Sequence, residues 1–240
     1  VSSVTGEGLE ELRATLDAAL DAVEEPSDIG RPRLGIDRVF TMSGFGTVVT
    51  GTLLGGRLRL GDTLEVMPDG PTARVRGLQT HGQTEEEAQP GTRVAVNLSG
   101  VGTDELSRGQ VLAPPGRMTR VTAFDVRLRV LSRRELAHNL RVAVHTGAAE
   151  VQGRVRVLDG DAIEAGESGW AQVVLREPLA LVAGDLVVLR VSDETMAGGR
   201  VVEVNPPRHR RRDAGTIERL EAMSAGTPES AVLAALERLE

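Results

Sequence analysis

A charged pair, Asp37-Arg38, interrupts an apolar, strand-like segment that reads IDRVFTMSGFGTVVTGT over residues 36–52. A carboxylate and a guanidinium side by side can form part of a binding site that uses charge-assisted hydrogen bonds. They can also form an exposed ion pair, which contributes only about 0 to 1 kcal/mol to stability. From the residues alone, the exposed ion pair is the favoured interpretation.

A glycine loop follows in the same segment. Gly44-Phe45-Gly46 lacks the third glycine of a dinucleotide-binding fingerprint, and a β-branched run rather than a helical pattern comes after it. We therefore expect no helix N-terminus to meet a phosphate at this position. The pattern instead predicts a turn that joins two strands of a hairpin.

The sequence offers no recognisable catalytic group. Lysine is absent, so the G-x-x-x-x-G-K-[ST] phosphate loop cannot form, and no G-x-S-x-G motif is present. Cysteine is absent too, which removes disulfides, thiolate ligands and cysteine nucleophiles. The histidines lie far apart and lack the spacing of metal ligands; they are His81, His138, His145 and His209. We predict no catalytic residue and no metal site in this chain.

Charge is distributed unevenly along the 240 residues. The net charge is −7, and residues 1–28 hold eight acids and one base, so the rest of the chain is balanced. An arginine surface that meets phosphates is therefore compatible with the acidic total. Aromatic residues make up 2% of the chain, which argues against base stacking as the main mode of nucleic-acid recognition.

The hydropathy pattern gives no sign of a membrane segment. There is no apolar run of eighteen residues and no export or lipidation signal. We expect no membrane partner, and a cytoplasmic location is compatible with the sequence.

A helix is predicted at each end of the chain. An apolar stripe predicts an amphipathic helix over about residues 7–22; it consists of Leu9, Leu12, Leu16 and Leu20. Asp213 is a candidate N-cap for a helix over 215–223, and Thr227-Pro228-Glu229 introduces another over 230–240. The final ALERLE has no helix stop signal, so we expect the sequence to be a piece of a longer protein.

Short β-type runs separated by Gly, Asp and Pro turns fill the chain between these helices. One series extends from residue 33 to about 115 and a second from 120 to 205. In the second series, valines alternate with charged residues, which places the valines on one face and the arginines on the other. The spacing predicts a mainly β fold built from small barrels or sandwiches.

Several motifs in combination resemble translational GTPases of the elongation factor Tu type. GFGTVVTGTLLGG at 44–56, followed by GDTL at 61–64, is similar to their second domain. RVRGLQTHGQ at 74–83, PGTRVAVNLSGV at 90–101 and NPPRHRR at 205–211 are similar specifically to the selenocysteine-specific elongation factor family. The opening VSSVTGEGLEEL resembles the last guanine-contact motif and the final helix of the GTPase domain.

The resemblance implies two consecutive small antiparallel β-barrels, the translation-factor domains II and III. The boundaries it suggests are 1–28 for the end of the GTPase domain, 29–116 for domain II, 117–206 for domain III, and 207–240 for a linker and the start of winged-helix domain IV. It implies a complete protein that delivers selenocysteinyl-tRNA to the ribosome with the help of GTP. Further winged-helix domains of that protein would bind an mRNA hairpin.

The resemblance assigns no nucleotide site to this chain alone. Ser2 and Ser3 match the guanine-contact motif, but no phosphate loop accompanies them. GTP and magnesium are therefore expected only in the complete protein, and we expect no GTPase activity from these 240 residues.

Asp37, Arg38 and Arg93 match the amino-acid pocket of the family. A selenol is more acidic than a thiol, so a site that selects selenocysteine benefits from a fixed cation. Arg38 is expected to supply that charge, with Asp37 holding its guanidinium or bonding the aminoacyl end. Neighbouring strand residues face opposite sides, however, so both side chains reach one pocket only if a bulge or a strand end reorients one of them.

A second set of basic side chains is a candidate surface for the acceptor and T arms of the tRNA, because arginine forks suit phosphate oxygens. Its members are Arg127, Arg129, Arg141, His145, Arg154 and Arg156. The alternative is a solvated strand face balanced by nearby acids. The arginines of the basic run, Arg208 and Arg210 to Arg212, are interpreted as a solvated linker in preference to an RNA contact.

Two other functions stay open from the sequence. One is a generic aminoacyl-tRNA carrier similar to elongation factor Tu. The other is a double barrel that binds proteins and has no role with RNA. The start of a winged-helix region after the second β series favours the selenocysteine-specific family over the first of these.

Overall fold

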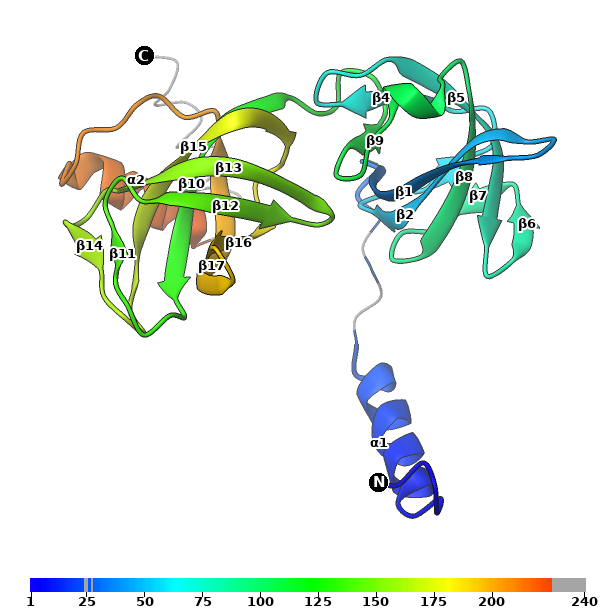
Figure 1. Cartoon of the computed structure of the whole chain (residues 1–240), viewed down its shortest axis with the longest axis horizontal. Coiled ribbons are helices and arrows are strands. Elements are labelled where there is room, and N and C mark those ends of the chain that lie inside the picture. The colour runs from blue at the N-terminus through cyan, green and yellow to red at the C-terminus, as the bar shows by residue number, and fades with distance from the viewer. Residues whose placement is uncertain (24–25, 27, 226–240) are drawn as a thin grey trace.

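The computed structural model of the chain describes residues 1–23, 26 and 28–225. Two antiparallel β-barrels lie side by side and are joined by a connecting segment (Figure 1). The prediction of a mainly β chain with two consecutive barrels is confirmed.

The first barrel closes through six strands in the order β4-β9-β1-β2-β8-β5, with β5 pairing back to β4. Strand β6 extends this sheet beyond β5, β3 and β7 form a separate ribbon, and η1 is a short 3-10 turn. The bounds are β1 Arg33–Met42, β2 Gly46–Leu54, β3 Leu58–Arg59, β4 Thr63–Met67, β5 Thr72–Thr80, β6 Gln83–Glu85, β7 Glu87–Ala88, β8 Arg93–Ser99, η1 Thr103–Glu105 and β9 Val111–Ala113.

The second barrel is closed in the order β10-β15-β13-β12-β16-β17, and β11 and β14 form a ribbon beside it. Its bounds are β10 Arg120–Val130, β11 Leu136–Ala137, β12 Arg141–Thr146, β13 Ala149–Val157, β14 Ala162–Ile163, β15 Ser168–Ala180, β16 Leu186–Val191 and β17 Glu194–Val204.

Each barrel encloses its own apolar core, which follows from the period-two patterning of the strands. In β10, Phe124, Val126 and Leu128 are fully buried, whereas Arg127 and Arg129 between and beyond them are exposed. The predicted separation of apolar residues and arginines onto two faces is confirmed for this strand.

The two barrels touch through polar and apolar contacts. Arg33 of the first barrel makes a bidentate ion pair with Asp185 of the second, with Nη1 2.7 Å from Oδ2. Asp69 and Arg120 form another ion pair across the junction. Between them, a small apolar cluster joins the barrels; it contains Met67, Ala113, Met118 and Ala180.

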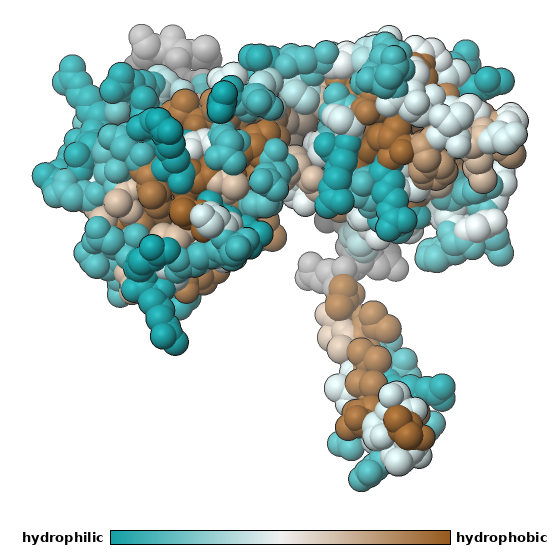
Figure 2. Space-filling view, viewed as in Figure 1, coloured by the Kyte–Doolittle hydropathy of each residue, from teal (hydrophilic) through white to brown (hydrophobic). Residues whose placement is uncertain are grey.

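The helices differ in their packing. Helix α1 (Leu9–Asp21) has no buried residue, and Figure 2 shows hydrophobic residues along it. Helix α2 (Ala214–Ser224) packs on the second barrel, where Leu220 is fully buried against Leu158 and Trp170. Asp213 accepts a hydrogen bond from the Thr216 amide, so the predicted N-cap is confirmed. The helix predicted for 230–240 lies outside the described residues.

Neither described helix combines the length and the apolar character that crossing a membrane requires.

Candidate functional site

The Asp37-Arg38 pair lies at a β-bulge in β1. Ile36 pairs with Gly51 and Arg38 pairs with Thr50, so Asp37 is one extra residue without a partner in β2. The bulge shifts the alternation of the strand. Ile36 is buried in the core before it, and Val39 packs on the same core after it, three residues later.

The bulge leaves both charged side chains outside the core, near one residue of the neighbouring strand. Thr50 is the cross-strand partner of Arg38, and its hydroxyl donates to Asp37 Oδ1 over 2.7 Å. Cross-strand partners project from the same face of a sheet. Asp37 and Arg38 therefore reach one surface region, as a site that uses both requires.

A glycine opposite the bulge permits a close approach of the two strands. A Cβ atom on Gly51 would lie 2.1 Å from the carbonyl oxygen of Gly35, far inside any real contact. Any other residue at position 51 would force β1 and β2 apart. The geometry of the charged pair thus depends on a glycine that carries no functional group.

Arg93 of β8 completes the cluster. Its Nη2 donates to Asp37 Oδ1 over 2.9 Å and to Thr50 Oγ1 over 3.3 Å, while Nη1 donates to Asp37 Oδ2. Asp37 thus pairs with Arg93, and no bond to Arg38 occurs among the contacts of the described residues. Three strands, β1, β2 and β8, supply the group.

The electrostatics of the cluster follow from these contacts. The hydrogen bond from Arg93 holds the pKa of Asp37 below its ordinary value, although burial acts in the opposite direction. Asp37 is thus ionised and neutralises Arg93. Arg38 is exposed and forms no ion pair with the described residues, so it is the cation of this cluster that stays available to a ligand.

The Gly44-Phe45-Gly46 loop joins β1 to β2, which confirms the predicted hairpin turn. Gly44 and Gly46 have φ values of 81° and 84°, which L side chains rarely adopt. The Phe45 amide donates to the Met42 carbonyl over 3.0 Å, and the Phe45 side chain is 56% exposed.

The basic candidates of the second barrel fall into separate patches. Arg141 and Arg154 are direct cross-strand partners, and with Arg156 they line a hollow of about 510 Å³ on the outer face of β12, β13 and β15. Arg127 and Arg129 line another hollow, of about 560 Å³, which Met223 and Ser224 at the end of α2 also border.

The remaining contacts distinguish these candidates further. The Arg127 guanidinium lies over the Trp170 ring, 5.5 Å from its centroid. His145 belongs to neither patch and lies 3.8 Å from a Glu150 carboxylate oxygen. Sequence reasoning missed Arg176 in the first hollow and Arg200 in the second. Arg200 is the direct cross-strand partner of Arg127, and only the strand register of the structure shows this pairing.

A row of polar residues crosses the outer face of the second barrel on β13, β15, β10 and β17. Each member is the cross-strand partner of the next; this polar row consists of Arg156, Gln172, Asp125 and Glu203. Asp125 is fully buried, and Gln172 and Glu203 nearly so. The linker and α2 cover them.

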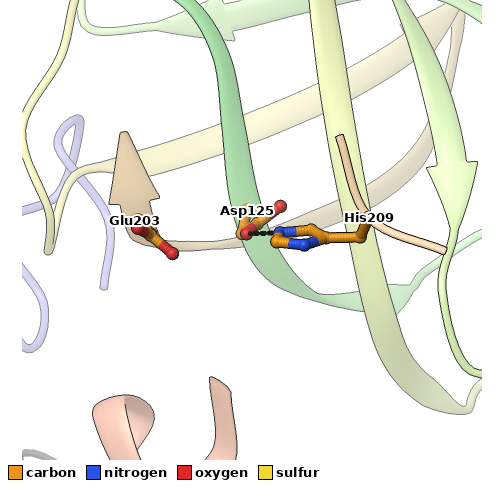
Figure 3. A group of neighbouring side chains, drawn as sticks. All are labelled: Asp125, Glu203 and His209. Carbon is orange, nitrogen blue, oxygen red and sulfur yellow. Dashed lines mark hydrogen bonds and ion pairs between the residues drawn. The ribbon is translucent and has the colours of Figure 1, made fainter. Parts of the chain in front are cut away.

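The linker binds the polar row through specific side-chain contacts. His209 Nε2 lies 2.6 Å from Asp125 Oδ2, with the His209 side chain only 5% exposed (Figure 3). Arg219 of α2 donates to Glu203 over 2.6 Å. Burial raises the pKa of Asp125, and the hydrogen bond with His209 opposes that shift. His209, which stands within the basic run, is thus the partner that the buried Asp125 carboxylate needs.

Asp125, Glu203 and His209 place one potential metal-ligand atom each within 4.8 Å of one another. Their observed partners indicate a different role. Arg219 already supplies a positive charge to Glu203, and Asp125 is bonded to His209 and approached by Gln172. The geometry supports a docking network between barrel and linker.

Ser2 and Ser3 lie in the turn before α1. The Ser2 hydroxyl accepts from the Thr5 amide over 3.2 Å, and the Gly6 amide donates to the Ser2 carbonyl. Their assignment as a remnant of the guanine-contact motif stays a prediction.

Comparison with known proteins finds two family matches. The family described as "Selenocysteine-specific elongation factor, beta-barrel domain" matches residues 123–208, and "Elongation factor Tu domain 2" matches residues 46–113. A selenocysteine-specific elongation factor from Desulfomicrobium baculatum is 43% identical over 98% of the chain. The chain belongs to the selenocysteine-specific elongation factor family.

Other relatives agree with this placement. The selenocysteine-specific elongation factor of Escherichia coli K12 is 35% identical over 86% of the chain, and elongation factor Tu 2 of Streptomyces avermitilis is 33% identical over 80%. The chain spans 38% of the D. baculatum protein, 33% of the E. coli protein and 52% of the S. avermitilis protein. It thus corresponds to a part of the longer family members, and that part includes both barrels.

Proposed function

We propose that this chain is the tRNA-binding part of a translation elongation factor that carries selenocysteinyl-tRNA to the ribosome. The first barrel would hold the aminoacyl end, and the basic outer face of the second barrel would contact the tRNA backbone. The bulge at Asp37 carries the proposal, because it brings Asp37, Arg38 and Arg93 to one exposed surface.

The chemistry of the cluster suits a selenolate. A selenol ionises near neutral pH, whereas a serine hydroxyl stays neutral. A fixed cation therefore favours selenocysteine over serine. Asp37 neutralises Arg93 and fixes its orientation, which leaves Arg38 with an uncompensated charge. A selenolate would therefore be attracted by one exposed arginine, while Asp37 and Thr50 offer oxygen acceptors for the amino group beside it.

Protection of the aminoacyl ester from hydrolysis tests this proposal. Protein expressed from the complete reading frame should protect selenocysteinyl-tRNA better than the same tRNA charged with serine. Arg38→Ala should reduce this preference by about tenfold or more, since a charge-assisted hydrogen bond contributes about 1.5 to 3 kcal/mol.

A matched control is available in the same barrel. Arg76 is exposed and is also the extra residue of a bulge, in β5 opposite β8. Arg76→Ala removes the same charge and should leave the preference for selenocysteine unchanged. Equal preference for both aminoacyl groups in the unmodified protein, or full preference in Arg38→Ala, would refute the assignment.

A generic aminoacyl-tRNA carrier is the second candidate, because an elongation factor Tu is among the relatives. Such a protein would protect ordinary aminoacyl-tRNAs as well as it protects selenocysteinyl-tRNA. The match of residues 123–208 to the barrel of the selenocysteine-specific family favours the first candidate.

The proposal extends to the complete protein. GTP with magnesium would bind a GTPase domain of which residues 1–28 are the end, and an mRNA hairpin would bind winged-helix domains of which 207–240 are the start. Residues 29–116 and 117–206 would be domains II and III. The ribosome would be a further partner, in the cytoplasm.

A further inference from the structure

We propose that Arg208, in the segment that follows the second barrel, forms a phosphate-binding site with Arg154 and Arg156 of β13, and that its ligand is the phosphodiester backbone of RNA. This inference rests on the proposed function and adds to it that the linker, and not only the barrel, belongs to the RNA-binding surface.

Three contacts bring Arg208 onto the barrel. Gln172 Nε2 donates to the Pro207 carbonyl over 2.8 Å, and His209 Nε2 lies 2.6 Å from Asp125. Further along, the Arg212 amide donates to the Leu158 carbonyl over 2.6 Å. Arg208 stands between the first two contacts, so its backbone is held although its side chain is exposed.

Arg156 links the linker to the strand face. Arg156 and Arg208 line one hollow of about 500 Å³, together with His138 and Arg210. Arg156 also lines the hollow of about 510 Å³ that contains Arg141 and Arg154. The two hollows therefore share a side chain and form a continuous basic surface from β12 across β13 to the linker.

This basic surface lacks the acids that would neutralise it. Among the described residues, no carboxylate forms an ion pair with Arg154, Arg156 or Arg208. Arg154 faces Arg141 directly across the strands, an arrangement of like charges that costs stability. Burial lowers the pKa of Arg156, and the charges of Arg208 and Arg154 lower it further. A bound anion would relieve this repulsion.

The next arginines of the linker show the contrast. Arg211 and Arg212 both form ion pairs with Asp161, the latter at 2.7 Å. Asp161 thus offsets one of their two charges, whereas no ion pair with a carboxylate of the described residues is formed by Arg208. Two arginines four residues apart in one segment therefore differ in their availability to a ligand.

RNA fits the surface better than an acidic protein segment does. Arg154 and Arg156 are two residues apart on one strand, about 6.6 Å at the usual strand rise, which suits successive phosphates of one RNA strand. The surface offers arginine forks without an exposed apolar anchor, whereas protein interfaces are centred on buried apolar or aromatic residues. The exposed large hydrophobic residues of the second barrel lie elsewhere; they are Leu131, Leu186 and Val188.

The inference is tested by equilibrium binding to this chain. The probe is a fluorescent transcript of the selenocysteine tRNA that carries no amino acid. Arg208→Gln should weaken binding about fivefold and reduce the slope of log affinity against log salt by about one. Arg212→Gln removes the same charge from the same segment and should change affinity less than about twofold, because Asp161 already compensates Arg212. Thermal unfolding checks that both variants keep the fold.

A double variant makes the test specific to a shared phosphate. Arg156→Gln with Arg208→Gln should weaken binding by less than the product of the single effects, because both side chains contact the same group. Equal effects of Arg208→Gln and Arg212→Gln would overturn the inference and leave the proposed function standing. Absence of transcript binding to the chain would overturn the inference alone, because the proposed function is tested separately by protection of the aminoacyl ester in the complete protein. If polyglutamate competes with the tRNA as effectively as RNA of equal charge does, the ligand of this surface would be an acidic protein segment and not RNA.

Discussion

Two arginine clusters, one on each barrel, differ in how their charge is balanced. In the first barrel, Arg93 is held by a bidentate pair with Asp37, and three strands fix the group through Thr50. In the second, Arg141 and Arg154 face each other without an acid between them. The first arrangement is stable without a ligand, and the second carries repulsion that a ligand would remove.

This difference suits the two kinds of recognition that we propose for this chain. A geometrically fixed, nearly neutral cluster with a single free cation suits discrimination between small groups that differ in charge. A field of unpaired arginines suits a polyanion whose sequence does not matter, because phosphate contacts position a nucleic acid without specifying its bases. Variants that perturb the backbone geometry, a paired arginine or an unpaired arginine separate the two kinds of recognition.

The largest effect is expected from Gly51→Ala. The added Cβ would lie 2.1 Å from the Gly35 carbonyl oxygen, so β1 and β2 must separate at the bulge. We expect a loss of about 3 kcal/mol in the free energy of unfolding of the first barrel, the upper range for overpacking. Urea denaturation measures it. Gly35→Ala is the control, since no atom lies within 4 Å of a Cβ there; an equal loss in both would show that the close approach is not the cause.

A smaller effect on the free energy of unfolding is expected from Arg93→Gln, and this effect depends on pH. Arg93 lowers the pKa of Asp37, so Asp37 contributes stability above the pKa it has in the unfolded chain, and this is lost as pH falls through the lowered value. In Arg93→Gln the pKa of Asp37 should rise, and the protein should lose less stability when the pH falls. Carboxylate titration by NMR measures the pKa. An unchanged Asp37 pKa would mean that the pair does not persist in solution.

The smallest effect is expected from Arg154→Gln. Removing one of two opposed arginines should raise the free energy of unfolding by about 0.3 kcal/mol in dilute salt, and high salt should erase the gain. Arg134→Gln is the paired counterpart, because Arg134 is bonded to Glu194, and it should not stabilise. A destabilised Arg154→Gln would indicate that a carboxylate compensates this face in solution.

Much of the fold could be predicted from the sequence because it depends on local patterns. Strand alternation, the Gly44 turn and the Asp213 cap each involve residues within a few positions of one another. The bulge at Asp37 also has a local signal in the spacing of the core residues. The apolar residues Leu34 and Ile36 are two apart, and the next core residue, Val39, is three further on.

The rest could not be predicted because it depends on register and on what covers each face. Asp37 and Arg93 are 56 positions apart, and only the order β1-β2-β8 brings them together. In β10, the alternating pattern predicts that Asp125 faces solvent like Arg127. Its burial is set by the linker, which returns over the barrel and places His209 on it.

The bulge has a genetic consequence. If Asp37 were deleted, Leu34, Ile36 and Val39 would follow one another at regular intervals of two, and β1 would pair with β2 without interruption. The bulge itself is therefore equivalent to a single inserted codon in an otherwise ordinary barrel strand. Three nucleotides add Asp37 to a surface on which Arg38, Thr50 and Arg93 are supplied by other codons of the three strands.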